Sequence, residues 1–313
     1  MSTPRFFLSL SLAGLLAACG GSSDDGNATG ELTLQVTDAA VDGALQVVVQ
    51  FRGIELHGPG GTQTYYYCED ASTGETVLSA AACAHPAPRQ LDLLALTDGL
   101  TEFLLDGLVT EAGRYAWVRL LVDAEPDVRD SYIVMPDGEH ELLVPSGAET
   151  GLKLNRGFTV PAGGTADFTI DFDLRKSVHD PLSGGVDYLL RPTLRIVDSA
   201  EAGAIAGEVD AALVTDGCTP AVYAYTGAGV TPDDVDGAAP DPVTTAQVKL
   251  DEETGLYRYK AAFLEPGNHT VAFTCQAAGD DPAMDDAIVF SGAATVAVAP
   301  GTVATHEFQA SLP

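Results

Sequence analysis

The chain has 313 residues, 46% of them hydrophobic, and its 45 acidic residues outnumber 15 basic ones, for a formal net charge of −30. The supply of Leu, Val, Ile, Ala and aromatic residues excludes a disordered acidic tail. The charge argues against nucleic acid and anionic lipid as partners, because phosphate groups are bound by Lys and Arg. It favours solubility and the attraction of cations.

Residues 1–18 have the organisation of a signal peptide. Arg5 precedes an apolar stretch, Phe6 to Ala18, that is too short to span a bilayer, which takes about 20 residues. Small residues end the stretch, as at a secretory cleavage site, and Cys19 follows directly. This pattern resembles the bacterial lipoprotein signal, in which the cysteine carries the lipid and becomes the mature N-terminus. An ordinary signal peptide followed by an incidental cysteine is the alternative.

Residues 19–29 are predicted to form a flexible tether, because they are rich in Gly, Ser and Asp. Gly20, rather than Asp, follows the cysteine, and by resemblance to sorting signals this favours the outer membrane of a Gram-negative cell. We therefore expect a cell-envelope protein held to the membrane by its N-terminal lipid. Both the periplasmic and the outward-facing orientation stay open.

Strand patterns dominate the first half of the remaining chain. Apolar residues alternate with polar ones or run continuously between Gly- and Pro-rich turns. A little helix is expected in residues 91–104. The predicted strands are residues 31–36, 45–56, 114–123, 166–174 and 189–197.

A break at residues 198–204 separates a second series of strand patterns. Only three basic residues, Lys249, Arg258 and Lys260, lie between residue 204 and the C-terminus. Many short strands separated by turn residues predict an all-β protein with two β-sandwiches in tandem, residues 30–198 and 204–313. The strands expected in the second domain are residues 204–210, 221–227, 255–263, 269–277, 294–300 and 304–312.

Several motifs in the first half resemble the domain of unknown function 4382 family of bacterial lipoproteins. They are "TLQVTDAAVDGALQVVVQFRGIELH", "LDLLALTDG", "AGRYAWVRLLVD", "VPSGAETGLKL" and "IDFDLRKSVHD" with "YLLRPTLRIV". The resemblance covers roughly residues 30–198 and implies a fold and a setting but no activity. Relative to that family, residues 62–88 look like an insertion. The second half, with "GAIAGEV" and "PGNHTVAFT", more weakly resembles prealbumin-like domains of the carboxypeptidase-regulatory-like or Cna-B-like kind, which are usually spacers or adhesive modules.

The four cysteines beyond Cys19 predict two disulfides, as is usual in exported proteins. Of the three pairings, only Cys68–Cys83 with Cys218–Cys275 keeps each bridge within one predicted domain. Zinc is the alternative ligand of such cysteines. No C-x-x-C occurs, however, and no histidine lies at ligand spacing from them.

Motifs for catalysis are missing from the sequence. It contains no G-x-S-x-G, no H-E-x-x-H, no P-loop and no dinucleotide fingerprint. We therefore predict a non-enzymatic protein without a resident cofactor, acting in surface interaction, adhesion or envelope structure. A hydrolase whose residues form no recognisable motif is one alternative, and a calcium- or carbohydrate-binding module is another.

Two stretches are candidate surfaces for a protein or glycan ligand. In "IDFDLRKSV", strand alternation places Ile170, Phe172 and Leu174 on one face and Asp171, Asp173 and Arg175 on the other, with Lys153 and Arg191 on strands that could lie beside it. This face forms either a charge network or a binding site. Tyr65, Tyr66 and Tyr67 lie in the insertion, and tyrosines bind sugars and proteins well because they are rigid and amphipathic.

Two acidic loops are candidate calcium sites, because Ca²⁺ binds six to eight oxygens. Neither loop fits the EF-hand pattern, and solvated acidic loops are the alternative interpretation. The candidates are Asp233, Asp234 and Asp236 in the first loop, and Asp280, Asp281, Asp285 and Asp286 in the second.

Overall fold

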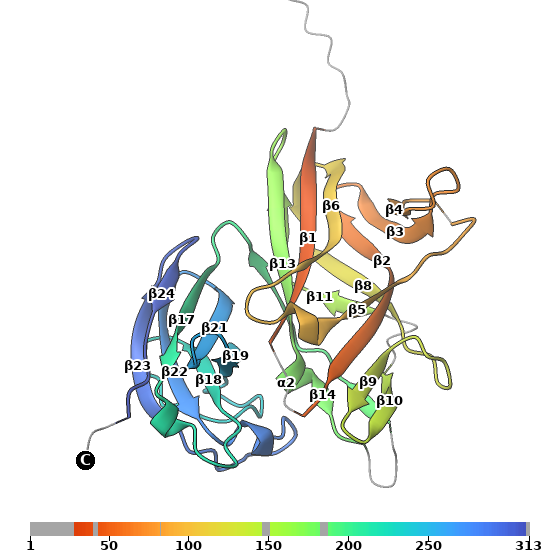
Figure 1. Cartoon of the computed structure of the whole chain (residues 1–313). Coiled ribbons are helices and arrows are strands. Elements are labelled where there is room, and N and C mark those ends of the chain that lie inside the picture. Colours follow the sequence, from red (N-terminus) through yellow and green to blue (C-terminus); the bar gives the residue numbers. More distant parts are fainter. Residues whose placement is uncertain (1–27, 40–42, 82, 146–150, 182–186, 311–313) are drawn as a thin grey trace, which may run out of the picture.

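A computed structural model describes residues 28–39, 43–81, 83–145, 151–181 and 187–310. The predicted signal peptide, Cys19 and nearly all of the tether lie outside the described residues. The structure is all-β, with sheets in two groups that we call the N-terminal unit (residues 29–198) and the C-terminal unit (residues 203–308) (Figure 1). The sandwich-type fold predicted from the strand patterns is confirmed.

One sheet of the N-terminal unit is built around two parallel strands. Strand β1 (Thr29–Ala39) pairs in parallel with β13 (Thr165–Asp173) and antiparallel with β6 (Glu102–Glu111). Strand β16 (Leu194–Asp198) completes the order β16-β13-β1-β6. Every second side chain of β1 from Leu32 to Val36 is fully buried, as a strand with one face on the core requires.

The opposing sheet has β2 (Gln46–Gly58) at its centre, paired with β8 (Trp117–Asp123) and with several shorter strands. The two sheets enclose one hydrophobic core. A separate two-stranded sheet pairs β7 (Gly113–Tyr115) with β12 (Phe158–Val160). The shorter strands of the large sheet are β3 (Gly61–Glu69), β4 (Thr76–Ser79), β5 (Arg89–Asp92), β9 (Tyr132–Met135), β10 (Gly138–Leu143), β11 (Leu152–Leu154), β14 (Val178–His179) and β15 (Tyr188–Leu190).

The helix expected in residues 91–104 is reduced to a single 3-10 turn, η1 (Leu93–Leu96). Asp92 caps the turn by accepting from Leu94 N, and the backbone leaves helical geometry at Asp98 and Gly99, whose φ angles are 62° and 84°. The buried Thr37 hydroxyl donates to the carbonyls of Leu96 and Leu100. These two contacts with β1 hold the segment in its turn, and β6 begins at Glu102.

The C-terminal unit is a sandwich of two four-stranded sheets. A core lies between them, and a second small core lies on the outer side of one sheet, so β18 is buried on both faces through Val222 and Tyr223. The sheet order β20-β21-β17-β24 is formed by β20 (Lys249–Asp251), β21 (Leu256–Leu264), β17 (Gly203–Val209) and β24 (Val303–Thr305). The order β19-β18-β22-β23 is formed by β19 (Thr244–Gln247), β18 (Ala221–Thr226), β22 (Gly267–Thr274) and β23 (Ser291–Val298).

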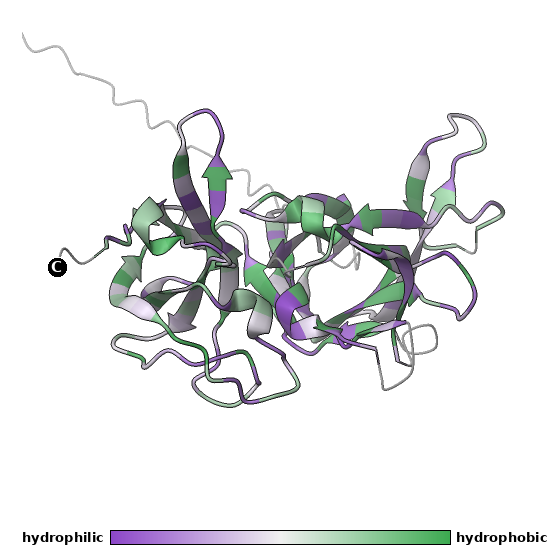
Figure 2. Cartoon of the chain, turned by 60° about the horizontal axis from the view of Figure 1, so that its bottom comes forward, coloured by the Kyte–Doolittle hydropathy of each residue, from purple (hydrophilic) through white to green (hydrophobic). Residues whose placement is uncertain are grey.

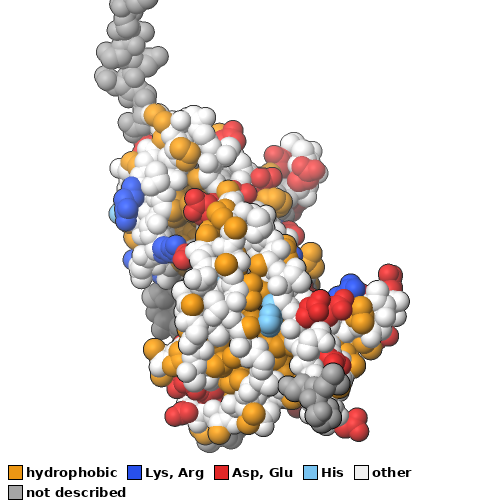
Figure 3. Space-filling view, turned by 90° about the vertical axis from the view of Figure 1, so that its left-hand side faces the viewer, with side chains coloured by type: hydrophobic (Ala, Val, Ile, Leu, Met, Phe, Trp, Pro, Cys, Tyr) orange, Lys and Arg blue, Asp and Glu red, His pale blue; other side chains and the backbone are white. Residues whose placement is uncertain are grey.

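The two units lie side by side, and in both the strands alternate between hydrophobic and hydrophilic residues (Figure 2). The outer side of the C-terminal unit is covered mostly by hydrophobic and uncharged side chains, with acidic residues gathered toward its edges (Figure 3). Residues 291–305, which include the edge strand β23, contain no charged residue. Among the described residues, no helix has the length and apolar character needed to cross a membrane.

Basic residues of the N-terminal unit hold the two units together. Arg175, in the short helix α2 (Leu174–Ser177), donates from Nη1 to Ala277 O at 2.8 Å. Lys176 pairs with Asp241 at 2.5 Å, and Arg195 donates from Nη1 to Phe263 O at 2.6 Å. Arg175 is 3% exposed, so this interface excludes water around a cation. A buried charge is stabilised only when it has hydrogen-bond or ion-pair partners, so these contacts determine how the two units dock.

Candidate functional site

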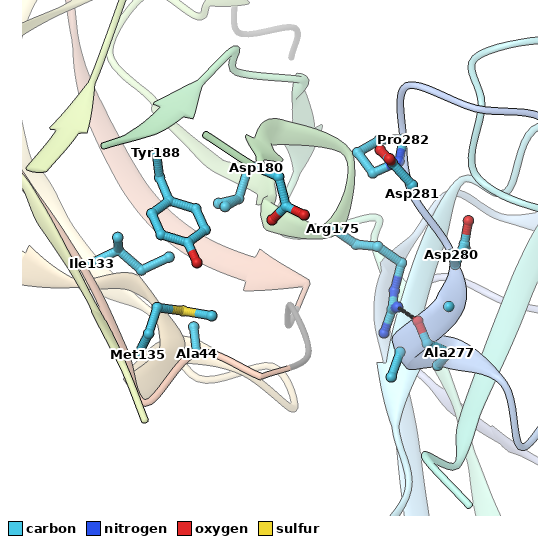
Figure 4. Close-up of a pocket in the computed structure, with 13 residues that line it drawn as sticks. Ala44, Ile133, Met135, Arg175, Asp180, Tyr188, Ala277, Asp280, Asp281 and Pro282 are labelled. Carbon is cyan, nitrogen blue, oxygen red and sulfur yellow. Dashed lines mark hydrogen bonds between the residues drawn. The ribbon is translucent and has the colours of Figure 1, made fainter. Parts of the chain in front are cut away.

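A cavity of about 200 Å³ lies between the two units, beside α2 (Figure 4). Ile133, Met135 and Tyr188 form an apolar wall from the N-terminal unit, and the opposite wall comes from the 3-10 turn η3 (Ala277–Gly279) and the loop after it. Figure 4 shows Arg175 reaching from α2 to the carbonyl of Ala277. The tertiary structure alone creates this cavity, because its walls are more than 80 residues apart in the sequence.

Acidic groups give the cavity its chemical character. Asp180, Asp280 and Asp281 line it, and burial raises the pKa of Asp280 above the ordinary range. Burial, with the charge of Asp180 added, also raises the pKa of Tyr188. The described lining residues include no Ser, Thr, Cys or His, so Asp and Tyr side chains and one arginine are the reactive groups of the cavity. Its chemistry suits the binding of a positively charged group that has an apolar stem.

The two predicted calcium loops meet in the structure, each contributing to one cluster. One carboxylate oxygen from each of Asp234, Asp280 and Asp286 lies within 4.8 Å of the others. Asp233 and Asp236 of the first loop, and Asp281 and Asp285 of the second, are outside this cluster. The sequence identified both loops as candidate calcium ligands. It could not predict that residues about 50 positions apart lie next to one another. Three of the candidate ligands, drawn from both loops, therefore form a single cluster.

Of the two alternatives for the charged face of "IDFDLRKSV", the structure shows the charge network and not an exposed ligand surface. Asp171 is 3% and Asp173 6% exposed, because the C-terminal unit covers this face. The strand also ends at Asp173, whose carboxylate caps α2 by accepting from Lys176 N, so Leu174 and Arg175 are helical. Asp171 pairs with Arg195 at 2.5 Å, which makes the face a charge network within the interface.

Lys153 and Arg191 do not flank β13. Lys153 lies on β11, which pairs with β8 in the opposing sheet, and its Nζ is 4.5 Å from the centre of the Trp117 ring. Arg119 and His57 also contact that ring, at 5.0 and 5.1 Å. Arg191 follows β15, where its N–H donates to Ser177 O at 2.8 Å. The cationic group around the only tryptophan was missed because cross-strand neighbours depend on pairing, which spacing does not reveal.

Three buried carboxylates lie together at the interface end of β1 and β13. The parallel register places Thr37 opposite Asp171 and Asp38 opposite Phe172. Burial raises the pKa of Asp38 well above its usual range, and the charges of Asp171 and Asp173 raise it further. Burial likewise raises the pKa of Asp173 to about 6. The sequence analysis did not select Asp38. The only signal in the sequence is its position at the end of a strand pattern typical of a buried strand.

This cluster predicts that stability falls as the pH rises. An acid whose pKa is higher in the folded than in the unfolded chain holds its proton more tightly when folded. Its contribution is greatest below the unfolded pKa of 3.8 and is lost as the pH rises to about 6 for Asp173. Replacing Asp38 by Asn removes one charge while keeping an oxygen for the Leu174 N–H. We expect a smaller decline in the free energy of unfolding between pH 4.5 and 7.

Urea unfolding at the two pH values measures this effect. Asp106→Asn is the control, since Asp106 is an exposed acid on the neighbouring strand β6, and it should leave the decline unchanged. Equal pH dependence in the wild type and Asp38→Asn would contradict the assignment of the raised pKa to this cluster.

The three consecutive tyrosines of β3 have different environments. Tyr65 and Tyr67 are 8% and 3% exposed, and the Tyr67 hydroxyl donates to Leu104 O at 2.6 Å. Alternation on β3 turns both rings inward, so neither forms an exposed aromatic face. Each nevertheless lines a surface pocket, and the pocket of Tyr67 is the groove that it shares with Tyr66. Tyr66 is half-buried and lines a groove with Tyr67, Cys83, Pro86, Pro88 and the pair Arg52–Asp123, whose charged atoms are 2.8 Å apart.

Both disulfides have the predicted pairing. Cys68–Cys83 joins β3 to the segment before β5, with Cα atoms 5.5 Å apart. Cys218–Cys275 joins the segment before β18 to the residue after β22, with Cα atoms 4.6 Å apart. The first bridge holds the segment before β5 against β3, and the second connects the ends of two paired strands of the C-terminal unit.

The fold and the cavity define a β-sandwich protein of two units with a cavity between them. The family model "Domain of unknown function (DUF4382)" matches residues 29–192, more than half of the chain. The chain therefore belongs to the DUF4382 family, as its sequence motifs predict. No curated protein matches it.

Solved structures match over most of the chain, but weakly. The TIE protein of Bacillus anthracis is 11% identical with a TM-score of 0.19, and the match covers 90% of this chain and 34% of that one. A leucine-rich repeat protein of Bacteroides thetaiotaomicron is 14% identical with a TM-score of 0.21, over 90% and 27% of the two chains. The minor pilin of Streptococcus agalactiae is 11% identical with a TM-score of 0.19, over 90% and 98%. The chain thus spans about a third or less of the first two proteins. Likeness at these scores establishes no shared function.

Proposed function

We propose that this chain is a lipid-anchored protein of the cell envelope that acts by binding, in adhesion or in envelope structure, and that it is not an enzyme. The observation that carries the proposal is the N-terminal order of an apolar stretch, Cys19 and a polar tether that leads directly into β1 at Thr29. C-terminal to this tether, the two sandwiches are docked against each other through buried charged residues. A lipid at one end and a fixed pair of units at the other suit display of a surface away from a membrane.

The proposal includes a prealbumin-like relationship for the C-terminal unit and an outer-membrane location. Two opposed four-stranded sheets, with strand orders β20-β21-β17-β24 and β19-β18-β22-β23, support the first of these. Gly20 after Cys19 supports the second.

A glycan is the ligand class that we assign to the groove of Tyr66. A sugar presents apolar C–H groups on its ring face and hydroxyls at its edge. The ring of Tyr66 can stack against the face of the sugar ring, while Arg52 and Asp123 can form hydrogen bonds with the sugar hydroxyls. Pro86 and Pro88 add rigid apolar walls, and the Cys68–Cys83 disulfide holds the insertion in place, so little entropy is lost on binding. Neutral hydroxyl groups also avoid the repulsion that an acidic protein exerts on anions.

Fractionation and protease treatment of a Gram-negative host test the proposal. Wild-type protein is expected in the membrane fraction and the Cys19→Ala variant in the soluble fraction, because the variant has no thiol to carry a lipid. Loss of the wild type from intact, protease-treated cells would support adhesion, and loss only after lysis would support a structural role inside the envelope. Retention of Cys19→Ala on membranes would contradict the anchor.

The same strains test the ligand surface. Cells or lysates that contain the wild type are compared with those that contain Tyr66→Ala for binding to immobilised glycans. Tyr132→Ala is the matched control, since Tyr132 is a half-buried tyrosine on β9 outside the groove. Loss of binding in Tyr66→Ala alone supports a glycan site, and equal binding by all three proteins contradicts it.

A further inference from the structure

Two loops at one end of the C-terminal unit bring three acids together. Asp234 belongs to the loop between β18 and β19, and Asp280 and Asp286 belong to the loop between η3 and β23. One carboxylate oxygen of each lies within 4.8 Å of the other two. Oxygens bound to one Ca²⁺ at 2.3–2.6 Å are separated by about 5 Å at most, so these three can share one ion.

One oxygen of this cluster is buried without a partner. Asp234 is only 1% exposed, and its Oδ1 accepts no hydrogen bond from any described residue. Its other oxygen, Oδ2, accepts from the backbone N–H of Asp286. Burying a carboxylate oxygen without a donor or a cation is costly, and buried polar atoms are nearly always satisfied. A cation held among the three carboxylates would remove that cost.

Hydrogen bonds fix the other two carboxylates in place. Asp280 Oδ1 accepts from Val235 N at 3.1 Å, and its Oδ2 accepts from the hydroxyl of the buried Tyr223. Asp286 Oδ2 accepts from Asp281 N at 2.8 Å. These bonds connect the two loops and orient the acids before any ion binds. Such fixed orientation of ligands by their neighbours is typical of metal sites.

The charges around the cluster leave a role for a cation. Asp280 lies near both the negative charge of Asp234 and the positive charge of Arg175 in α2. Nη1 of that arginine donates to Ala277 O, within the interface between the units. Two of the three basic residues of the C-terminal unit form ion pairs elsewhere, Lys249 with Asp98 and Arg258 with Glu208 and Asp251.

We propose that Asp234, Asp280 and Asp286 bind one Ca²⁺ ion, which clamps the two loops of the C-terminal unit together. The ligands are all oxygens, which Ca²⁺ prefers, and they include none of the nitrogen or sulfur atoms that favour zinc. Mg²⁺ requires oxygens at 2.0–2.1 Å in a strict octahedron and keeps several waters, which a partly buried set of three carboxylates disfavours. Because Asp280 also lines the cavity between the units, the ion would fix one wall of that cavity.

Thermal unfolding of the full chain, followed by far-UV circular dichroism, tests the proposal. Extracellular calcium modules bind with Kd values of about 10⁻⁴–10⁻³ M, so 10 mM Ca²⁺ is up to about a hundredfold excess. We expect Ca²⁺ to raise the unfolding midpoint by about 5–10 °C over the value in EGTA. Isothermal titration with CaCl₂ should give one site per chain. The transition of Trp117, the only tryptophan, should shift less, because Trp117 lies in the N-terminal unit.

Two variants make the test specific. Asp234→Asn should abolish the calcium shift and, in EGTA, should unfold at the same temperature as the wild type or higher, since it removes a buried charge. Asp285→Asn is the matched control, with the same loss of charge next to Asp286 in the second loop but outside the cluster, and it should keep the shift. No shift and no binding at 10 mM Ca²⁺, an equal shift with Mg²⁺, or an undiminished shift in Asp234→Asn would each overturn the proposal. None of these outcomes bears on the lipid anchor or the glycan groove, which do not use these residues.

Discussion

Replacing Arg195 by alanine is expected to lower the free energy of unfolding by about 3–5 kcal/mol, because it leaves a buried carboxylate without its cation. The side chain of Asp171 is 4% exposed and that of Arg195 20%. Arg195 also donates to Phe263 O at 2.6 Å across the interface between the units. Without the guanidinium, Asp171 faces the neighbouring acids Asp38 and Asp173 uncompensated.

Urea unfolding followed by Trp117 fluorescence measures this loss in the N-terminal unit. The control is Arg129→Ala, which removes an arginine from the pair Arg129–Glu139, whose side chains are 60% and 41% exposed. Exposed pairs contribute about 0–1 kcal/mol, so the control should lose no more than that. The double variant Asp171→Asn/Arg195→Met, which removes both charges, should recover much of the stability. Equal losses for Arg195→Ala and Arg129→Ala would contradict the importance of the buried pair.

Removing the Cys218–Cys275 disulfide is expected to cost about 4 kcal/mol, because its loss frees a long loop in the unfolded chain. The two cysteines are 57 positions apart and pack against the core of the C-terminal unit. They close the ends of β18 and β22, which pair directly. The double substitution Cys218→Ala/Cys275→Ala should therefore destabilise mainly the C-terminal unit.

Two probes locate this effect. The far-UV circular dichroism transition, which reports both units, should move to lower urea more than the Trp117 fluorescence transition, which reports the N-terminal unit alone. The comparison variant is Cys68→Ala/Cys83→Ala, whose loop of 15 residues predicts a loss of about 3 kcal/mol, seen chiefly by Trp117. The interpretation fails if the Cys218/Cys275 variant shifts both probes equally or shifts neither.

The sequence alone established the class of fold and much of its framework. Alternation in β1 and β13 follows from the pleat of a strand, so the inward positions Leu32, Leu34, Ile170 and Phe172 could be predicted. The disulfide pairing followed because bridges within one domain keep both cysteines in the same core. Membership of the DUF4382 family rested on motifs that lie in order along the chain. All of these depend on local pattern or on order along the sequence.

Which surfaces are exposed depended on the tertiary structure. The alternation of residues in a strand predicts that Asp171 and Asp173 share a face, but it does not predict what covers that face. In the folded protein the C-terminal unit covers it. In the same way, two of three consecutive tyrosines became core residues once β3 had paired with β2.

The candidate calcium cluster is a second feature that the sequence alone could not predict. Acidic composition marked both loops, yet Asp234 meets Asp280 and Asp286 only because β18 pairs with β22 and brings the ends of these strands together. Contacts between residues far apart in the sequence are fixed by strand pairing and by docking of the units. Those are properties of the folded chain as a whole, and no short stretch of sequence contains them.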